Sequence, residues 1–316
     1  MMNKILITPR SLTKSRHPSL DRLRDAGYEI VFSTPGQQPT EDELVALLPG
    51  CVGYLAGVEP ITKRVLESAT DLSVISRNGT GIDNVDLDVA NKLCIKVCRA
   101  EGANARGVAE LAITLMLALT RSIPFSDAAI KVNGWQRRQG VELEGRTLGL
   151  VGCGKIGSLV ASFGLAFGMK VAAYDIFQDE RLRQTSGFFY QTLDEVLSES
   201  DFISLHCPQQ KDGMPLVNNR VVDRLKPGVY IINTARAGLI DESAIMRGIE
   251  SGIVSGFATD VFENEPPLER ELLLSDRVIA TPHIGGFTAE SVSRAVSVAV
   301  DNVLEHLKQG GILSHV

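Results

Sequence analysis

The chain has 316 residues, of which 44% are hydrophobic and 22% are charged, a composition typical of a globular protein and not of a disordered chain. Its formal net charge is −6 and it has no long basic run, which argues against nucleic acid as a partner. At about 150 residues per domain, this length predicts two domains.

Cysteine usage and apolar runs point to a cytoplasmic protein. Cys94 and Cys98 form the only close pair, and with no histidine near them we interpret both as buried small hydrophobic residues and predict no metal site. Pro9 interrupts the N-terminal apolar run before a signal peptide can develop, and the longest apolar stretch, residues 111–119, is too short to span a bilayer. We therefore expect reduced thiols and no membrane partner. The five cysteines are Cys51, Cys94, Cys98, Cys153 and Cys207.

Short β-branched runs alternate with helical patterns along the whole chain. Such alternation predicts parallel sheets with helical crossovers, and its division into two series predicts an α/β protein with two doubly wound units. The first series of expected strands covers residues 5–7, 29–32, 51–56, 72–76 and 94–98. The second covers residues 147–152, 170–175, 202–206, 229–234, 256–260 and 278–281.

A long helix is predicted between the two series, with Asn104 as a possible N-cap. The part of this helix between Leu111 and Leu119 is apolar nearly all round, because four apolar residues lie off its core-facing side. These are Ile113, Met116, Leu117 and Ala118. A helix without a polar face must be central in its own domain or covered by a second subunit. We favour the second subunit, and so predict a homodimer through this helix.

A glycine pattern follows the first strand of the second series. Gly152, Gly154 and Gly157 form G-x-G-x-x-G between that strand and a helical pattern at residues 159–167. Gly152 permits a tight turn, Gly154 lets the backbone approach a pyrophosphate, and Gly157 lets the helix pack on the strand. Glycine turns without a nucleotide are common, but the strand and helix around this one predict a dinucleotide site.

Asp175 ends the next strand and selects the cofactor. It lies 175 − 157 = 18 residues after the last glycine, close to the spacing at which a carboxylate reaches the adenosine ribose hydroxyls. A carboxylate there would repel the 2′-phosphate of NADP, and the following Ile176 and Phe177 offer no arginine to receive one. We therefore predict NAD.

Polar clusters follow three later strands, at residues 234–236, 260–266 and 281–286. Since ligands bind outside the carboxyl ends of strands in a doubly wound sheet, these clusters can converge on one crevice. Hydride transfer between NAD and a 2-hydroxy acid needs a cation for the carboxylate, a group that exchanges the hydroxyl proton, and a partner that orients it. Arg236, His283 and Glu265 are of these types, although each alone could be an ordinary surface or turn residue.

The chain resembles the D-isomer-specific 2-hydroxyacid dehydrogenase family, with the phosphoglycerate dehydrogenase branch closest. The resemblance implies a Rossmann-type NAD-binding domain, residues 102–285, inserted in a flavodoxin-like substrate domain that consists of residues 1–101 and 286–316. The terminal helix, expected at residues 288–307, would return to the first domain. The motifs occur in the family's order over essentially the whole chain, at residues 77–86, 151–157, 205–208, 233–241, 260–266 and 281–286.

The resemblance also implies a role for each site residue. Arg236 would bind the substrate's carboxylate and carbonyl, Glu265 would partner the histidine, and His283 would be the acid/base that protonates the developing alkoxide. The backbone at Asn78 and Gly79 would hold the substrate carboxylate. The cofactor would lie on Gly152, Gly154, Lys155, Ile156, Gly157, Asp175, Cys207, Thr234, Ala235, Arg236, Asp260, His283, Gly285 and Gly286, with Asp260 facing the nicotinamide carboxamide.

The substrate is less well defined than the chemistry. Arg77 could bind a substrate phosphate, as the phosphoglycerate branch implies, or could support the substrate loop. Asn78 stands where the family commonly has a small apolar residue, which weakens any transfer of substrate identity. The leading candidate is phosphohydroxypyruvate, a small anionic 2-keto acid, and hydroxypyruvate, glyoxylate or another short 2-keto acid is the alternative.

A second class of function is an NAD-sensing binding module. The C-terminal binding protein corepressors resemble the same family and retain the dinucleotide site, so an intact cofactor motif does not by itself indicate an enzyme. The sequence shows no long polar arm for recruiting partners, which favours the enzyme.

Overall fold

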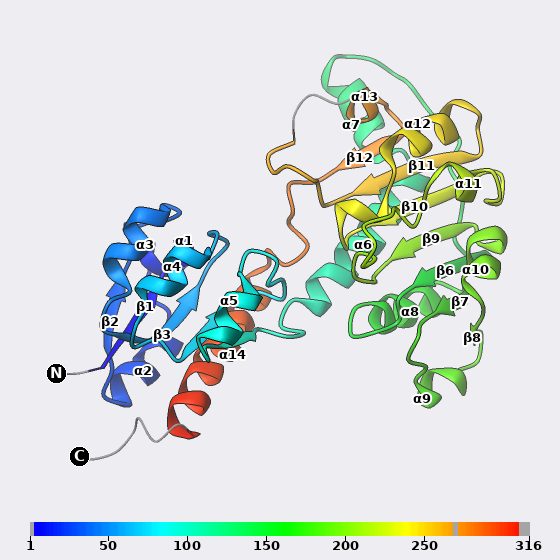
Figure 1. The fold of residues 1–316 in the computed structure, drawn as a ribbon. Coiled ribbons are helices and arrows are strands. Elements are labelled where there is room, and N and C mark those ends of the chain that lie inside the picture. The colour runs from blue at the N-terminus through cyan, green and yellow to red at the C-terminus, as the bar shows by residue number, and fades with distance from the viewer. Residues whose placement is uncertain (1–2, 268–270, 310–316) are drawn as a thin grey trace. The chain divides into compact units, whose positions relative to one another are not determined.

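The chain forms two compact α/β units in a computed structural model that describes residues 3–267 and 271–309 (Figure 1). Unit 1 is Met1–Asn104 with Ala289–Val316, and unit 2 is Ala105–Thr288. These divisions lie three residues after the predicted boundaries at 101 and 285 (104 − 101 and 288 − 285), and residues 310–316 lie outside the described residues. Each unit has its own parallel sheet, which confirms the predicted fold class.

Unit 1 has a five-stranded sheet of order β2-β1-β3-β4-β5, the flavodoxin-like order. Helices α2 and α14 supply the core on one face of this sheet, and α3, α4 and α5 supply it on the other. The strands are β1 Lys4–Ile7, β2 Glu29–Phe32, β3 Cys51–Ala56, β4 Val74–Arg77 and β5 Lys96–Arg99. The helices are α1 Arg10–Lys14, α2 Asp21–Asp25, α3 Glu41–Leu47, α4 Lys63–Ser68, α5 Leu87–Lys92 and α14 Ala289–Gln309.

The structure corrects the strand predicted at residues 94–98. The N–H of Cys94 donates to the carbonyl of Asn91 (3.1 Å) and that of Ile95 to Ala90 (2.9 Å), the two bonds of a Schellman motif that closes α5. Cys94 has a φ of 56°, the left-handed conformation that this motif requires, so β5 begins only at the second residue after it. Cys94 is also exposed, so its interpretation as a buried residue is wrong.

Unit 2 has a seven-stranded sheet of order β12-β11-β10-β9-β6-β7-β8, in which the strand order reverses between β6 and β9. Helices α6 and α8 pack on one face, and α10, α11 and α12 on the other. The strands are β6 Thr147–Val151, β7 Lys170–Tyr174, β8 Phe188–Tyr190, β9 Phe202–Leu205, β10 Val229–Asn233, β11 Val254–Thr259 and β12 Val278–Ala280. The helices are α6 Ala105–Thr120, α7 Ile123–Lys131, α8 Gly157–Ala166, α9 Glu180–Arg183, α10 Leu193–Glu199, α11 Asn219–Val222, α12 Glu242–Glu250 and α13 Glu271–Leu274.

Strand β8 was not predicted from the sequence. It has only three residues, at the edge of the sheet, and of these only Phe188 is buried. A segment this short has too few positions to show the alternation that identifies longer strands. The other strands of unit 2 lie within one or two residues of their predicted ends.

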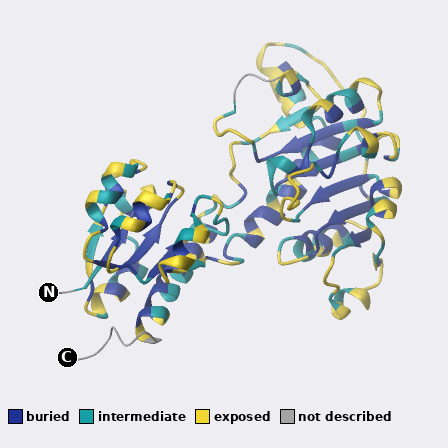
Figure 2. Ribbon diagram, in the orientation of Figure 1, coloured by how far each residue is buried: buried dark blue, intermediate teal, exposed yellow. Residues whose placement is uncertain are grey.

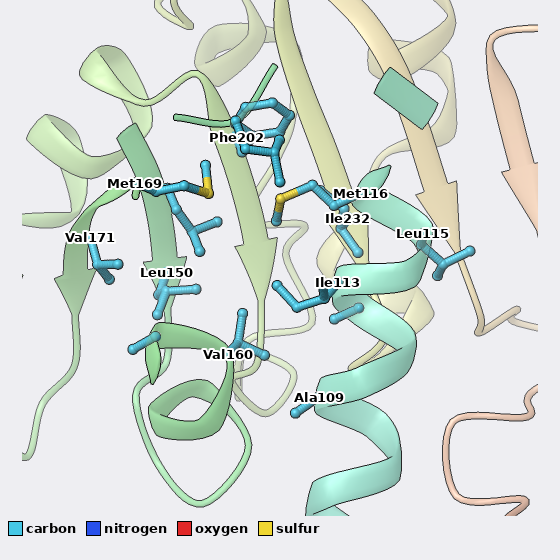
Figure 3. Packing of buried hydrophobic residues seen from close by; sticks show 14 of the residues in the cluster. Ala109, Ile113, Leu115, Met116, Leu150, Val160, Met169, Val171, Phe202 and Ile232 are labelled. Atoms are coloured by element: carbon cyan, nitrogen blue, oxygen red, sulfur yellow. The ribbon is translucent and has the colours of Figure 1, made fainter. Parts of the chain in front are cut away.

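Helix α6 is covered largely by its own unit. Figure 3 shows Ile113 and Met116 on the side of α6 that faces the strands, with Met116 near Phe202. Both residues are buried, so the core of unit 2 covers two of the side chains that suggested a second subunit. Leu111 and Leu117 remain partly exposed.

The predicted N-cap of α6 is not formed by the side chain of Asn104. Its Oδ1 is buried and has no hydrogen-bond partner among the residues that the structure describes. The helix therefore begins at Ala105 without the side-chain bond that usually satisfies the first free N–H groups.

Exposed residues are concentrated in the segments between strands, whereas the strands of both sheets are largely buried (Figure 2). No single described helix has both the length and the apolar composition needed to cross a membrane, and α6 with α7 meets this test only as a pair bent by 62°.

Candidate active site

The glycine loop lies at the reversal of strand order in unit 2, between β6 and α8. Gly152 has a φ of 92°, and a Cβ on it would lie 2.7 Å from the backbone N of Cys207. A Cβ on Gly157 would lie 2.2 Å from the carbonyl oxygen of Gly152, so helix and loop meet backbone to backbone. A Cβ on Gly154 would meet nothing within 4 Å, which leaves open space beside the helix N-terminus where a pyrophosphate can approach. Lys155 and Ile156 complete the turn into α8.

Asp175 follows β7 and its carboxylate holds the glycine loop. Its Oδ2 accepts from Cys153 N–H at 2.6 Å, and its Oδ1 accepts from Phe177 N–H at 2.8 Å. Each carboxylate oxygen keeps a further lone pair for a ribose hydroxyl. Ile176 and Phe177, which follow it, are exposed.

His206 and Cys207 follow β9, and their backbone lies against the glycine loop. Burial lowers the pKa of His206 to about 4, so this imidazole is neutral at physiological pH. Its Nε2 pairs with Ser204 Oγ at 2.9 Å, while its buried Nδ1 has no partner among the described residues. Burial also raises the pKa of the Cys207 thiol to about 11, so Cys207 contributes here as a neutral group.

Asn233, at the end of β10, shapes the loop of residues 234–236. Its Oδ1 accepts from Ala235 N–H at 3.0 Å and its Nδ2 donates to Arg236 O at 2.8 Å, which fixes the loop that presents the arginine. Thr234 is buried, and its Oγ1 has no partner in the described chain, as expected of a hydroxyl that awaits a ligand. Asn233 is not among the predicted site residues, although a polar amide at the end of an apolar strand indicates a specific contact there.

Asp260 holds the segment that carries the histidine. It is 1% exposed, and its Oδ1 accepts from Thr281 Oγ1 (2.6 Å) and Ile284 N–H (2.8 Å), while Oδ2 accepts from Gly285 N–H (2.8 Å). Its own N–H donates to Asn233 O at 3.0 Å. The carboxylate that the resemblance placed opposite a nicotinamide thus connects the loop after β11 with the segment after β12, and the backbone N–H of the same residue bonds to the end of β10.

His283 and Glu265 form the pair that the sequence predicted. The histidine Nδ1 lies 2.9 Å from both carboxylate oxygens of Glu265. The pair is half exposed, and Glu265 Oε1 also accepts from Phe262 N–H at 3.2 Å. His283 has a φ of 52°, a left-handed backbone that is uncommon for a residue with a side chain. With Nδ1 bound to the carboxylate, Nε2 is the nitrogen left for a reacting group.

The predicted substrate loop, in unit 1, uses its polar groups differently from the prediction. The N–H of Asn78 donates to Ala56 O and that of Gly79 to Arg77 O, both at 2.8 Å, so neither is free for a substrate carboxylate in this structure. Arg77 donates from Nε to Asn84 Oδ1 at 3.2 Å and from Nη1 to Asn78 O at 3.3 Å. Burial lowers the pKa of this guanidinium, and its contacts match the loop-supporting alternative.

A buried carboxylate that sequence reasoning missed lies at the carboxyl ends of β1 and β3. Glu59 is 1% exposed, and its Oε1 accepts from Tyr54 OH (2.6 Å), Gly57 N–H (2.8 Å) and Thr8 Oγ1. Its backbone oxygen accepts from Asn84 Nδ2 at 2.6 Å. Because Glu59 lies in a loop between Val58 and Pro60, no local pattern in the sequence indicates that it is buried.

The residues around the glycine loop of unit 2 fit a dinucleotide. Two glycines cannot accept a Cβ, the third leaves space at a helix N-terminus, and a carboxylate follows the next strand, which together form the Rossmann pyrophosphate and ribose sites. Within the described residues, no group of three or more His, Cys, Asp or Glu side chains could hold a metal ion.

Comparison with known families agrees with this geometry. Residues 113–285 match the family model described as D-isomer specific 2-hydroxyacid dehydrogenase, NAD binding domain. The chain belongs to this family. It is therefore an NAD-dependent oxidoreductase that acts on the CH–OH group of a 2-hydroxy acid, as the motifs and the resemblance predicted.

Individual members of the D-2-hydroxyacid dehydrogenases show how far the similarity extends. A hydroxypyruvate reductase of Thermotoga maritima is 41% identical over 273 residues, covering 84% of this chain and 88% of that protein. A D-3-phosphoglycerate dehydrogenase of Rattus norvegicus is 37% identical over 275 residues, 86% of this chain but only 51% of its own length. The crystal structure of D-lactate dehydrogenase from Aquifex aeolicus, complexed with NAD and lactic acid, superposes with a TM-score of 0.80 at 30% identity, covering 98% and 97% of the two chains.

Proposed function

We propose that this dehydrogenase reduces a short 2-keto acid to the D-2-hydroxy acid, with His283 as the acid/base, Glu265 as its partner and Arg236 as the substrate-binding cation. The contact of His283 Nδ1 with both oxygens of Glu265 at 2.9 Å carries this proposal. It orients the ring and leaves Nε2 for the substrate oxygen. By the family resemblance, unit 2 binds NAD and unit 1 binds the substrate.

The reaction takes one hydride and one proton. Bound NADH supplies the hydride to C2 of the keto acid. Protonated His283 gives the proton on Nε2 to the carbonyl oxygen, and the carboxylate of Glu265 stabilises the imidazolium before that transfer. Arg236, whose Nη1 donates to Ala235 O at 2.8 Å in this structure, would bind the substrate carboxylate with its guanidinium and so fix the carbonyl in position. Asp260 and Asn233 act as positioning residues, because their bonds hold the loops of His283 and Arg236.

Two substrates remain as candidates. Among the relatives reported above, hydroxypyruvate reductase and phosphoglycerate dehydrogenase differ in whether the C3 oxygen carries a phosphate, and this chain spans about half of the latter's length. The internal bonds of Arg77 favour hydroxypyruvate over the phosphohydroxypyruvate that the sequence suggested first.

A spectrophotometric panel tests the function. NADH oxidation is followed with hydroxypyruvate, phosphohydroxypyruvate, glyoxylate and pyruvate, and each reaction is repeated with NADPH. We expect activity with NADH and at most weak activity with NADPH, because the Asp175 carboxylate repels a 2′-phosphate. In the His283→Ala variant, turnover should fall by roughly 10²–10⁴-fold while NADH binding stays within about twofold. Tight NADH binding without oxidation of NADH by any keto acid would instead favour the NAD-sensing binding module.

A homodimer is the assembly that we propose for this enzyme. Leu111 and Leu117 on α6 stay partly exposed, and more exposed apolar side chains lie on α7 and just after it, at Ile130 (55%) and Trp135 (81%). A second copy would remove this apolar surface from water. Light scattering after size-exclusion chromatography should give twice the mass of one chain. A cytoplasmic location stays a prediction that rests on five free cysteines.

A further inference from the structure

Asn78 has a side chain whose polar group is not satisfied by the protein. Its Oδ1 is buried and has no hydrogen-bond partner in the described part of the chain. The backbone around it is fixed, because Asn78 N–H donates to Ala56 O at 2.8 Å and Asn78 O accepts from Arg77 Nη1 at 3.3 Å. A buried amide oxygen without a donor costs about 1–3 kcal/mol, and a ligand that supplies a donor would offset this cost.

The position of Asn78 is one where ligands bind in such sheets. It directly follows β4 and bonds to the last residue of β3, at the carboxyl ends of the parallel strands of unit 1. The neighbouring place, at the ends of β1 and β3, is filled by the chain itself, since the Glu59 carboxylate takes three donors there. Asn78 therefore stands beside a closed polar network with one acceptor still free.

The charges around Asn78 do not suit a phosphate. Arg77 is the only Lys or Arg at residues 77–86, and it donates to Asn84 and to Asn78 O. A Cβ on Gly79 would lie only 2.9 Å from its Nη1, so the guanidinium packs directly against the loop backbone. After β1, Arg10 donates to Gln38 Oε1 at 2.7 Å. A phosphate would bring acceptors and negative charge toward an amide oxygen and the buried Glu59 carboxylate.

We propose that Asn78 determines substrate specificity: its carboxamide oxygen accepts a hydrogen bond from a hydroxyl on C3 of the substrate. The enzyme then prefers a 2-keto acid with an uncharged hydroxymethyl group to the phosphorylated compound, which has no C3 hydroxyl donor, and to one that ends in a methyl group. This inference rests on the proposed function, because it names the substrate class of the same reaction.

The test is a double-mutant-type cycle that removes the Asn78 carboxamide from the protein and the C3 hydroxyl from the substrate. The wild type and Asn78→Ala are each assayed with hydroxypyruvate and with pyruvate, which differ only in the C3 hydroxyl. We expect the ratio of the two kcat/KM values to favour hydroxypyruvate in the wild type and to fall about tenfold in the variant. Asn78→Asp keeps an acceptor at the same place and should retain the wild-type ratio. An unchanged ratio in Asn78→Ala overturns the proposal.

Phosphohydroxypyruvate provides a second test of the proposal. Its kcat/KM with the wild type should be at least tenfold below that of hydroxypyruvate, and the reverse order overturns the specificity inference. Reduction of glyoxylate without any preference for hydroxypyruvate over pyruvate overturns the inference and leaves the proposed function standing. Failure to oxidise NADH with all four keto acids overturns the proposed function itself.

Discussion

The two units place polar groups at the carboxyl ends of their parallel strands in opposite ways. In unit 2, Gly154 faces open space, Thr234 Oγ1 has no partner in the described chain, and His283 keeps one ring nitrogen clear of its carboxylate partner. In unit 1, the corresponding place is filled by Glu59 and its donors, and Arg77 donates to the loop that follows it. Similar sheets can thus present a site ready for ligands or one that the chain has largely closed, with Asn78 Oδ1 and Ser33 Oγ left without a partner among the described residues of unit 1.

The difference shows that a carboxylate's surroundings, rather than its place after a strand, decide its role. Glu265 is half exposed and contacts a histidine, which suits proton chemistry. Glu59 is buried and takes only neutral donors, which suits fixing a loop. The contrast between these two carboxylates can be tested with a matched pair of substitutions.

The largest expected contrast is between Glu265→Gln and Glu59→Gln. Without the Glu265 carboxylate to orient His283, the kcat for keto-acid reduction should fall roughly 10²-fold, with little change in the free energy of unfolding. In Glu59→Gln, loss of a charged acceptor of three bonds should lower that free energy by about 2 kcal/mol.

Steady-state kinetics and urea denaturation of both variants give the comparison. If Glu59→Gln is as stable as the wild type, the buried network does not hold unit 1 together as described. If Glu265→Gln keeps full kcat, the acid/base assignment is wrong.

A smaller contrast lies within the glycine loop. Gly154→Ala adds a methyl group to open space, so it should leave the unfolding free energy nearly unchanged and raise the Kd for NADH at least tenfold. Gly157→Ala forces a Cβ against the backbone of Gly152, so it should also destabilise the protein by about 1–3 kcal/mol. NADH fluorescence titration and thermal unfolding measure the two effects. Equal stability losses in the two variants would contradict the open space at Gly154.

The smallest expected effect concerns His206. Burial lowers its pKa to about 4, below the ordinary value of 6.5, so the unfolded chain binds more protons than the folded chain between these values. Stability should therefore fall as the pH drops below 6.5, by about 1 kcal/mol at pH 5.5. Urea denaturation from pH 7.5 to 5 should show a shallower loss in His206→Asn. Identical slopes for the two proteins would indicate an exposed, freely titrating imidazole.

Local patterns in the sequence predicted most of the fold and several of the contacts at the candidate site. Glycine spacing, strand periodicity and the order of polar clusters identified the loop at Gly154 and the pair of His283 and Glu265, because each depends on residues near one another in a motif or just after a strand. The exposed Cys94 was missed because a helix-closing turn replaced the start of a strand. The network of Glu59 was missed because it depends on Thr8, which follows a different strand and lies 51 residues away in the sequence, a contact that no local pattern shows.

Unit 1 consists of two segments that are separated in the sequence by the whole of unit 2, and this order affects folding during synthesis. One face of its sheet is covered by Val296, Val300 and Leu307 of α14, which are translated after the whole of unit 2. On the ribosome, unit 2 can complete its core while the first 104 residues still expose an apolar surface to water and chaperones. Unit 1 can acquire its full core only once the chain has been made through α14.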